Sequence, residues 1–185
     1  MRRLAALLGA GAVMVTSCSG GELSTDEYAA AVEARAEVHA DQVLDLADKN
    51  ISELDVAVTQ LQRDLEGEEL EEAAVNETAR LAAVLFAGIG DALDGYVQDL
   101  DALDAPSELA ADHLAYIVAL ESSRSGIARL LSDLSAAVTF DDIDRAIASS
   151  GFSDAQPRVV AACTTLERDI EERGPLVDLR CEATG

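Results

Sequence analysis

The chain has little of several residue types, and each shortage excludes a class of function. It has no tryptophan and two histidines, and its 13 lysines and arginines stand against 36 aspartates and glutamates, for a formal net charge of −23. Nucleic-acid binding is excluded, because phosphate recognition needs clustered cationic side chains. The same charge is repelled by anionic lipid headgroups, so the protein body has no affinity of its own for a membrane surface.

The scarcity of histidine also limits the metal chemistry. Di-iron and di-manganese bundles use Glu-x-x-His on two helices, but Ala36 and Ala110 stand three residues before His39 and His113. A zincin helix and an EF-hand loop are missing. The nearest approach to a nucleophile elbow, residues 151–155, lacks its last glycine. We therefore predict that the protein is not an enzyme and carries no cofactor.

Aromatic residues make up 3% of the chain, whereas hydrophobic residues make up 49%. A chain of this composition is not disordered, and its core must be built from Ala, Leu, Val and Ile. Such small and aliphatic side chains suit closely packed helices.

Helical periodicity dominates from Ser24 onward, where Ser24 and Glu27 have the spacing of a capping box. Apolar residues then recur at three- or four-residue intervals, as expected for one face of a helix. The members of this stripe are Tyr28, Val32, Ala36, His39, Val43, Ala47, Ile51, Leu54, Val58, Leu61 and Leu65. They predict one long helix that ends near Gly67.

Four further segments complete the predicted fold. A second stripe runs from Leu70 to Leu103, with a kink or a close helix contact expected at Gly88–Gly95. The boundaries of the later segments follow from proline and from capping residues. These segments are 106–138, 139–149 and 153–173. Because the connections are short, we predict an all-α, up-down antiparallel four-helix bundle with long helices, whose last helix is broken near Ser149–Ser153.

The C-terminal segment contains two cysteines, Cys163 and Cys181. From Gly174 the chain is long enough to run back along the last helix to Cys163. We predict that a disulfide between them fastens the C-terminal tail to the bundle, since an exported chain oxidises such a pair. A redox couple is the alternative, but no Cys-x-x-Cys is present.

The N-terminal segment has the pattern of an export signal. Two arginines precede an uncharged run, Leu4 to Val15, which is too short to span a bilayer. Val15-Thr16-Ser17-Cys18 resembles the lipobox of bacterial lipoproteins. The resemblance implies cleavage before Cys18 and a diacylglycerol on its sulfur. The alternative is an ordinary secretory signal followed by an unpaired thiol. We expect a signal peptide at 1–17, a tether at 18–23 and a single helical domain at 24–185.

The second half of the chain carries a weaker resemblance. The segment Leu100–Leu109, followed by His113, Tyr116 and Leu120, is similar to uncharacterised exported bacterial helical proteins, and so is the ending around Cys163 and Cys181. This resemblance implies no activity.

Two candidate sites remain within the predicted bundle. At a rise of 1.5 Å per residue, His39 and His113 face the core at similar heights, with Tyr116 one turn away and Tyr96 and Arg35 nearby. This layer is a candidate ligand or metal pocket, or else two ordinary boundary histidines. The acidic run at 64–72 is a docking tip for a basic partner, or else a solvated turn.

The sequence therefore predicts a lipoprotein anchored in the cell membrane or the outer membrane, on the extracytoplasmic face. We expect only the lipid on Cys18 to contact the bilayer. Its function would be non-catalytic, as a binding or envelope accessory module with an envelope protein as partner. The alternative is a small-ligand or metal-binding bundle that uses His39 and His113.

Overall fold

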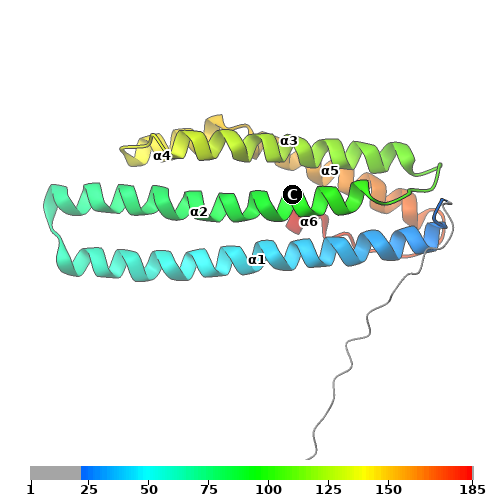
Figure 1. Ribbon diagram of the computed structural model, residues 1–185, viewed down its shortest axis with the longest axis horizontal. Coiled ribbons are helices and arrows are strands. Elements are labelled where there is room, and N and C mark those ends of the chain that lie inside the picture. The colour runs from blue at the N-terminus through cyan, green and yellow to red at the C-terminus, as the bar shows by residue number, and fades with distance from the viewer. Residues whose placement is uncertain (1–21, 185) are drawn as a thin grey trace, which may run out of the picture.

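Residues 22–184 are described by a computed structural model, shown in Figure 1. The first helix, α1, spans Thr25–Asp64 and is about 60 Å long at 1.5 Å per residue. Ser24 caps it: the Ser24 hydroxyl accepts the Glu27 amide, and the Glu27 carboxylate accepts the Ser24 amide at 3.1 Å. The predicted capping box is confirmed.

The remaining helices complete the predicted bundle. They are α2 (Gly67–Asp101), α3 (Ala110–Leu134), α4 (Phe140–Ser149), α5 (Phe152–Glu171) and the short α6 (Cys181–Thr184). Helices α1, α2 and α3 run antiparallel in turn, and α4 and α5 together form the fourth, interrupted member (Figure 1). The all-α, up-down four-helix bundle with a broken last helix is confirmed.

Two predicted helix starts are wrong. Helix α3 begins at Ala110 and not at Pro106, because residues 106–109 form a separate turn in which the Leu109 amide donates to the Pro106 carbonyl at 2.8 Å. Helix α5 begins at Phe152 and is preceded by Gly151 at φ 75°, so Ser153 is not its cap. Glycine adopts this left-handed conformation without the steric cost that a Cβ would add.

Helix α2 continues without a break through its glycines, and the close contact expected there is found at Gly88. A Cβ built on Gly88 would lie 2.9 Å from the Leu46 side chain of α1. Glycine therefore lets the two helices of the hairpin approach each other at this point.

The core divides into two clusters. The larger one, toward the start of α1, joins α1, α2, α3, α5 and the tail through residues such as Tyr28, Leu100, Leu120 and Leu166. The smaller one joins α2, α3 and α4 around Leu130. Each fully buried leucine contributes roughly 1.5–3 kcal/mol through loss of apolar surface. Helix α1 has no member in the smaller cluster, and its members of the larger cluster lie in its first half. Burial of apolar side chains therefore stabilises the distal half of α1 little.

The C-terminal tail is fastened as predicted by a disulfide between Cys163 and Cys181. The tail also contacts α1. The Asp178 amide donates to the Glu33 carboxylate at 3.1 Å, and the Arg180 guanidinium lies 3.9 Å from the Glu37 carboxylate. The tail thus occupies the space between α5 and the first half of α1. We call this half of the bundle proximal and the half toward the α1–α2 turn distal.

The apolar stripe of α1 is buried in the first part of the helix alone. No residue from Asp41 to Asp64 is buried, and Ile51 is 66% exposed. The reason is that α3 and α4 pack on α2 in this part of the bundle, on the side away from α1, so that α2 is the helix against which distal α1 packs (Figure 1).

Candidate functional site

His39 is buried between α1 and α2, with 3% of its surface exposed. Its ring stacks on Tyr96, with centroids 4.6 Å apart and an interplanar angle of 7°. Burial lowers the pKa of His39 to about 4, although a hydrogen bond to the Ala92 carbonyl acts in the opposite direction. The imidazole is therefore neutral at pH 7. Its Nδ1 has no hydrogen-bond partner.

His113 is held by a different set of partners. Its Nδ1 lies 2.7 Å from the Tyr28 hydroxyl, and burial lowers its pKa against the opposing effects of Asp101 and the Leu100 carbonyl. The pairing of Tyr28 with His113 was not predicted. The two residues are 85 positions apart, and their side chains gave no signal beyond membership of two apolar stripes.

Tyr116 is brought into the same polar cluster as His39. Its hydroxyl lies 3.2 Å from that of Tyr96, whose other neighbour is the His39 ring. The predicted layer was centred on His39 and His113, and of its other members Tyr96 and Tyr116 are the ones that lie beside His39. His113 is held elsewhere, by the Tyr28 hydroxyl. The backbone carbonyls that raise the pKa of His39 and of His113, Ala92 and Leu100, are eight residues apart on α2, a rise of about 12 Å.

No group of three His, Cys, Asp or Glu residues within 22–184 is arranged to hold a metal ion. The polar contacts of the histidine layer are instead those of buried hydrogen-bonding groups. The hypothesis of a small-ligand site therefore depends on whether the structure has a cavity beside His39.

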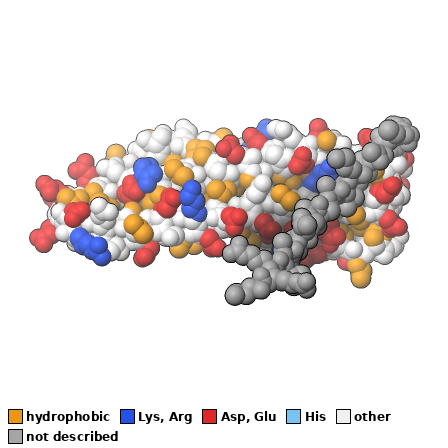
Figure 2. Space-filling model, turned by 60° about the horizontal axis from the view of Figure 1, so that its bottom comes forward, with side chains coloured by type: hydrophobic (Ala, Val, Ile, Leu, Met, Phe, Trp, Pro, Cys, Tyr) orange, Lys and Arg blue, Asp and Glu red, His pale blue; other side chains and the backbone are white. Residues whose placement is uncertain are grey.

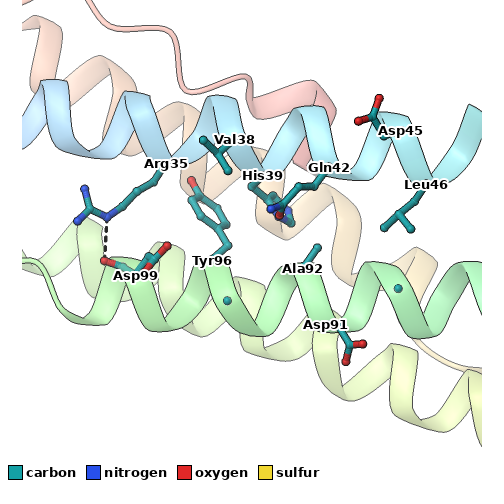
Figure 3. Close-up of a pocket in the computed structure, with 12 residues that line it drawn as sticks. Arg35, Val38, His39, Gln42, Asp45, Leu46, Asp91, Ala92, Tyr96 and Asp99 are labelled. Atoms are coloured by element: carbon teal, nitrogen blue, oxygen red, sulfur yellow. Dashed lines mark hydrogen bonds between the residues drawn. The ribbon is translucent and has the colours of Figure 1, made fainter. Parts of the chain in front are cut away.

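A groove of about 570 Å³ lies beside His39, between α1 and α2 (Figure 3). Tyr96 and Ala92 form its α2 wall together with two glycines, and Leu46 closes it at one end. Arg35 lines the other end, where its Nε donates to the Asp99 carbonyl at 3.1 Å. The groove therefore combines apolar walls with a buried imidazole.

A second candidate surface lies on the other side of α1. Leu44, Ile51 and Val58 are 52%, 66% and 37% exposed. We call these three residues the α1 stripe. Their seven-residue spacing places them in one row, since each step of seven turns the helix by nearly two full turns. The face toward the viewer in Figure 2, the α1 side, shows apolar side chains among carboxylates and a few lysine or arginine side chains.

A row of aspartates runs beside the α1 stripe. Asp41, Asp48 and Asp55 are all exposed and have the same seven-residue spacing, so they flank the stripe along its length. None of the three takes part in an ion pair within the described part of the chain. The apolar row is therefore edged by uncompensated negative charge.

The turn within the acidic run at 64–72 is shorter than predicted, because most of the run belongs to the two helices. Only Leu65 and Glu66 separate α1 from α2, and Glu68 and Glu69 belong to the first turn of α2. Carboxylates there stabilise the helix through its dipole. The charged residues of the run are exposed, and Figure 2 shows acidic side chains at this end of the molecule. A groove of about 280 Å³, lined by Val58 and Leu70 among others, adjoins the turn.

Cys18, the predicted site of lipid attachment, lies outside the described residues, as do the signal peptide and the tether up to Gly21. Within residues 22–184, every helix is too short or too polar to cross a membrane.

Comparison of the chain with protein-family models, with curated proteins and with solved structures finds no match.

Proposed function

We propose that the protein is a lipid-anchored, extracytoplasmic binding protein, held in the cell membrane or the outer membrane by acyl chains on Cys18. In this proposal the distal α1–α2 hairpin binds a helical envelope protein partner and no reaction is catalysed. The observation that carries the proposal is the α1 stripe, an exposed apolar row on a helix that the rest of the bundle leaves uncovered.

The proposed anchor would hold one end of the bundle near the bilayer. Four residue steps separate Cys18 from Glu22, a reach of about 14 Å at most. The start of α1 is bound to the α2–α3 connection, where the Leu23 amide donates to the Asp104 carbonyl at 3.3 Å. The α1–α2 turn lies at the far end of the 40-residue α1, about 60 Å from this point. The hairpin would therefore project away from the membrane.

The α1 stripe continues a side of α1 that is already used for packing. The tail contacts Glu37 on this side, and Leu44 lies seven residues further along the same row. Beyond the tail, the row remains apolar but has no cover. A peptide segment of the partner would take the place there that the tail takes at the proximal end.

The occupant that fits this surface is an amphipathic helix with a basic edge. A seven-residue apolar repeat is matched by the same repeat on a partner helix. The aspartate row at 41, 48 and 55 favours a partner with lysines or arginines beside its apolar face. A second copy of this chain is disfavoured, because its own net charge is −23 and its aspartate rows would repel.

The anchor is tested by the substitution Cys18→Ala, followed by membrane fractionation. We expect the variant to remain folded and to leave the membrane fraction, because the acidic body is repelled by anionic lipids. The control is Ser19→Ala, which keeps the cysteine and should stay membrane-bound. Retention of the Cys18→Ala variant in the membrane would contradict the proposal.

The binding face is tested by a photo-crosslinking residue placed at Ile51 in cells that make the full chain. Val56, which is 62% exposed, lies on another side of the same helix and is the matched control position. We expect a discrete adduct from position 51 and none from position 56, and we expect Leu44→Ser with Val58→Ser to abolish it. Equal adducts from both positions would count against a specific face.

A further inference from the structure

The Nδ1 atom of His39 is buried and has no hydrogen-bond partner, and in the tautomer protonated at Nε2 it is an acceptor. The residue is 97% buried, since its exposed fraction is 3%. A buried polar atom left unpaired costs about 1–3 kcal/mol, so such atoms are normally satisfied. This histidine is also one of the residues that line the 570 Å³ groove between α1 and α2.

The groove has more negative than positive charge at its edges. Asp45, Asp91 and Asp99 line it, and no ion pair within residues 22–184 includes them. Arg35 is the one cationic side chain among the lining residues, and its hydrogen bonds go to backbone carbonyls. A ligand that supplies positive charge and N–H donors would complement both the edges and Nδ1.

We propose that this groove binds a guanidinium group, one N–H of which donates to His39 Nδ1 while its charge faces the carboxylates of the groove. The site is distinct from the α1 stripe, because it lies on another side of α1, and it does not rest on the proposed function.

A guanidinium fits the groove better than an ammonium does. It is planar, it carries several N–H donors, and it is less strongly hydrated, so it loses less free energy when it leaves water for a buried acceptor. Its flat face also packs on aromatic rings, and Tyr96 lines the groove with its ring against His39.

Access to Nδ1 requires a small movement of the groove wall. Gln42 follows His39 by about one turn of α1, is exposed, and has its side chain beside the imidazole in Figure 3. On the α2 wall, Gly95 leaves space, because a Cβ built there meets no atom within 4 Å.

The test is a titration of the mature full chain, monitored by the NMR signals of His39 and by calorimetry. The probes are ethylguanidinium, which represents a free small ligand, and N-acetyl-arginine amide, which represents an arginine of a peptide. Propylammonium is the matched probe with an ammonium head. We expect ethylguanidinium to bind at least ten-fold more tightly than propylammonium. A stronger signal from the arginine amide would assign the source to a peptide.

Two variants connect the binding to the groove. His39→Phe keeps a ring against Tyr96 but lacks Nδ1, and we expect it to weaken binding about ten-fold or more, as for loss of a hydrogen bond to a charged group. Gly95→Leu keeps His39 and fills the groove, and we expect it to abolish binding, so the proposal stays testable if His39→Phe does not fold. Asp55→Asn is a charge control outside the groove. Unchanged binding in Gly95→Leu, or absence of binding in the unmodified chain, would overturn the proposal.

Discussion

Acidification should destabilise the protein through His39. In the folded chain the pKa of His39 is about 4, against an ordinary value of 6.5, and burial is the main cause. Between these two values the unfolded chain binds more protons than the folded chain does. The stability that the neutral imidazole contributes is therefore complete above pH 6.5 and is lost as the pH falls to 4. At 1.36 kcal/mol per pKa unit, the loss is about 3 kcal/mol.

The assay is urea unfolding at pH 7, 6, 5 and 4, with His39→Phe measured in parallel. Other groups also titrate: the pKa of His113 is lowered by burial, whereas burial raises those of Asp112 and Glu167. These contributions are common to both chains, so the difference between the two unfolding free energies isolates His39. We expect this difference to change by about 3 kcal/mol across the range. A constant difference would refute the reasoning.

Two further substitutions test the packing. Gly126→Ala should lower the free energy of unfolding by about 1–3 kcal/mol, because its Cβ would lie 2.7 Å from the Phe152 backbone, whereas Gly95→Ala, which meets no atom, should raise it by roughly 0.5–1 kcal/mol. Urea unfolding measures both, and equal effects would contradict the account. Replacing Cys163 and Cys181 by serine should cost about 3 kcal/mol for the lost loop constraint, and an unchanged unfolding midpoint would show that the tail contributes nothing.

The helices could be predicted because their starts are marked by residues close together in the sequence. The disulfide could be predicted because the chain has few cysteines. Ser24 with Glu27 and Thr139 with Asp142 mark two helix starts by spacing alone, and both capping boxes form. With one cysteine assigned to the lipid, the remaining pair had a single possible partner each, and the bond between Cys163 and Cys181 is present.

The exposure of the distal hairpin could not be predicted, because it depends on which helix α3 and α4 pack against. Periodicity shows which side of α1 is apolar, and it does so equally for Tyr28, which is buried, and Ile51, which is exposed. Whether a third helix covers that side of α1 is decided by the tertiary arrangement, in which α3 and α4 pack on α2. The tail, with its contact to Glu37, shows the same dependence on tertiary structure.

The candidate site was predicted in part. His39, Tyr96 and Tyr116 could be placed in one layer because the position of a residue along a helix axis follows from its number, at 1.5 Å per residue. The separate pairing of His113 with Tyr28 depends on how each ring is rotated about its helix, which heights do not specify. The groove beside His39 likewise depends on the spacing between α1 and α2.

The most direct test of the proposed binding function is identification, by tandem mass spectrometry, of the peptide joined to a photo-crosslinking residue at Ile51 in the native envelope. We predict that this peptide belongs to another envelope protein and forms an amphipathic helix with lysines or arginines beside its apolar face. We also predict that the adduct is lost when Asp41, Asp48 and Asp55 are all changed to asparagine. A peptide from a second copy of this chain, or one with an acidic face, would contradict the account.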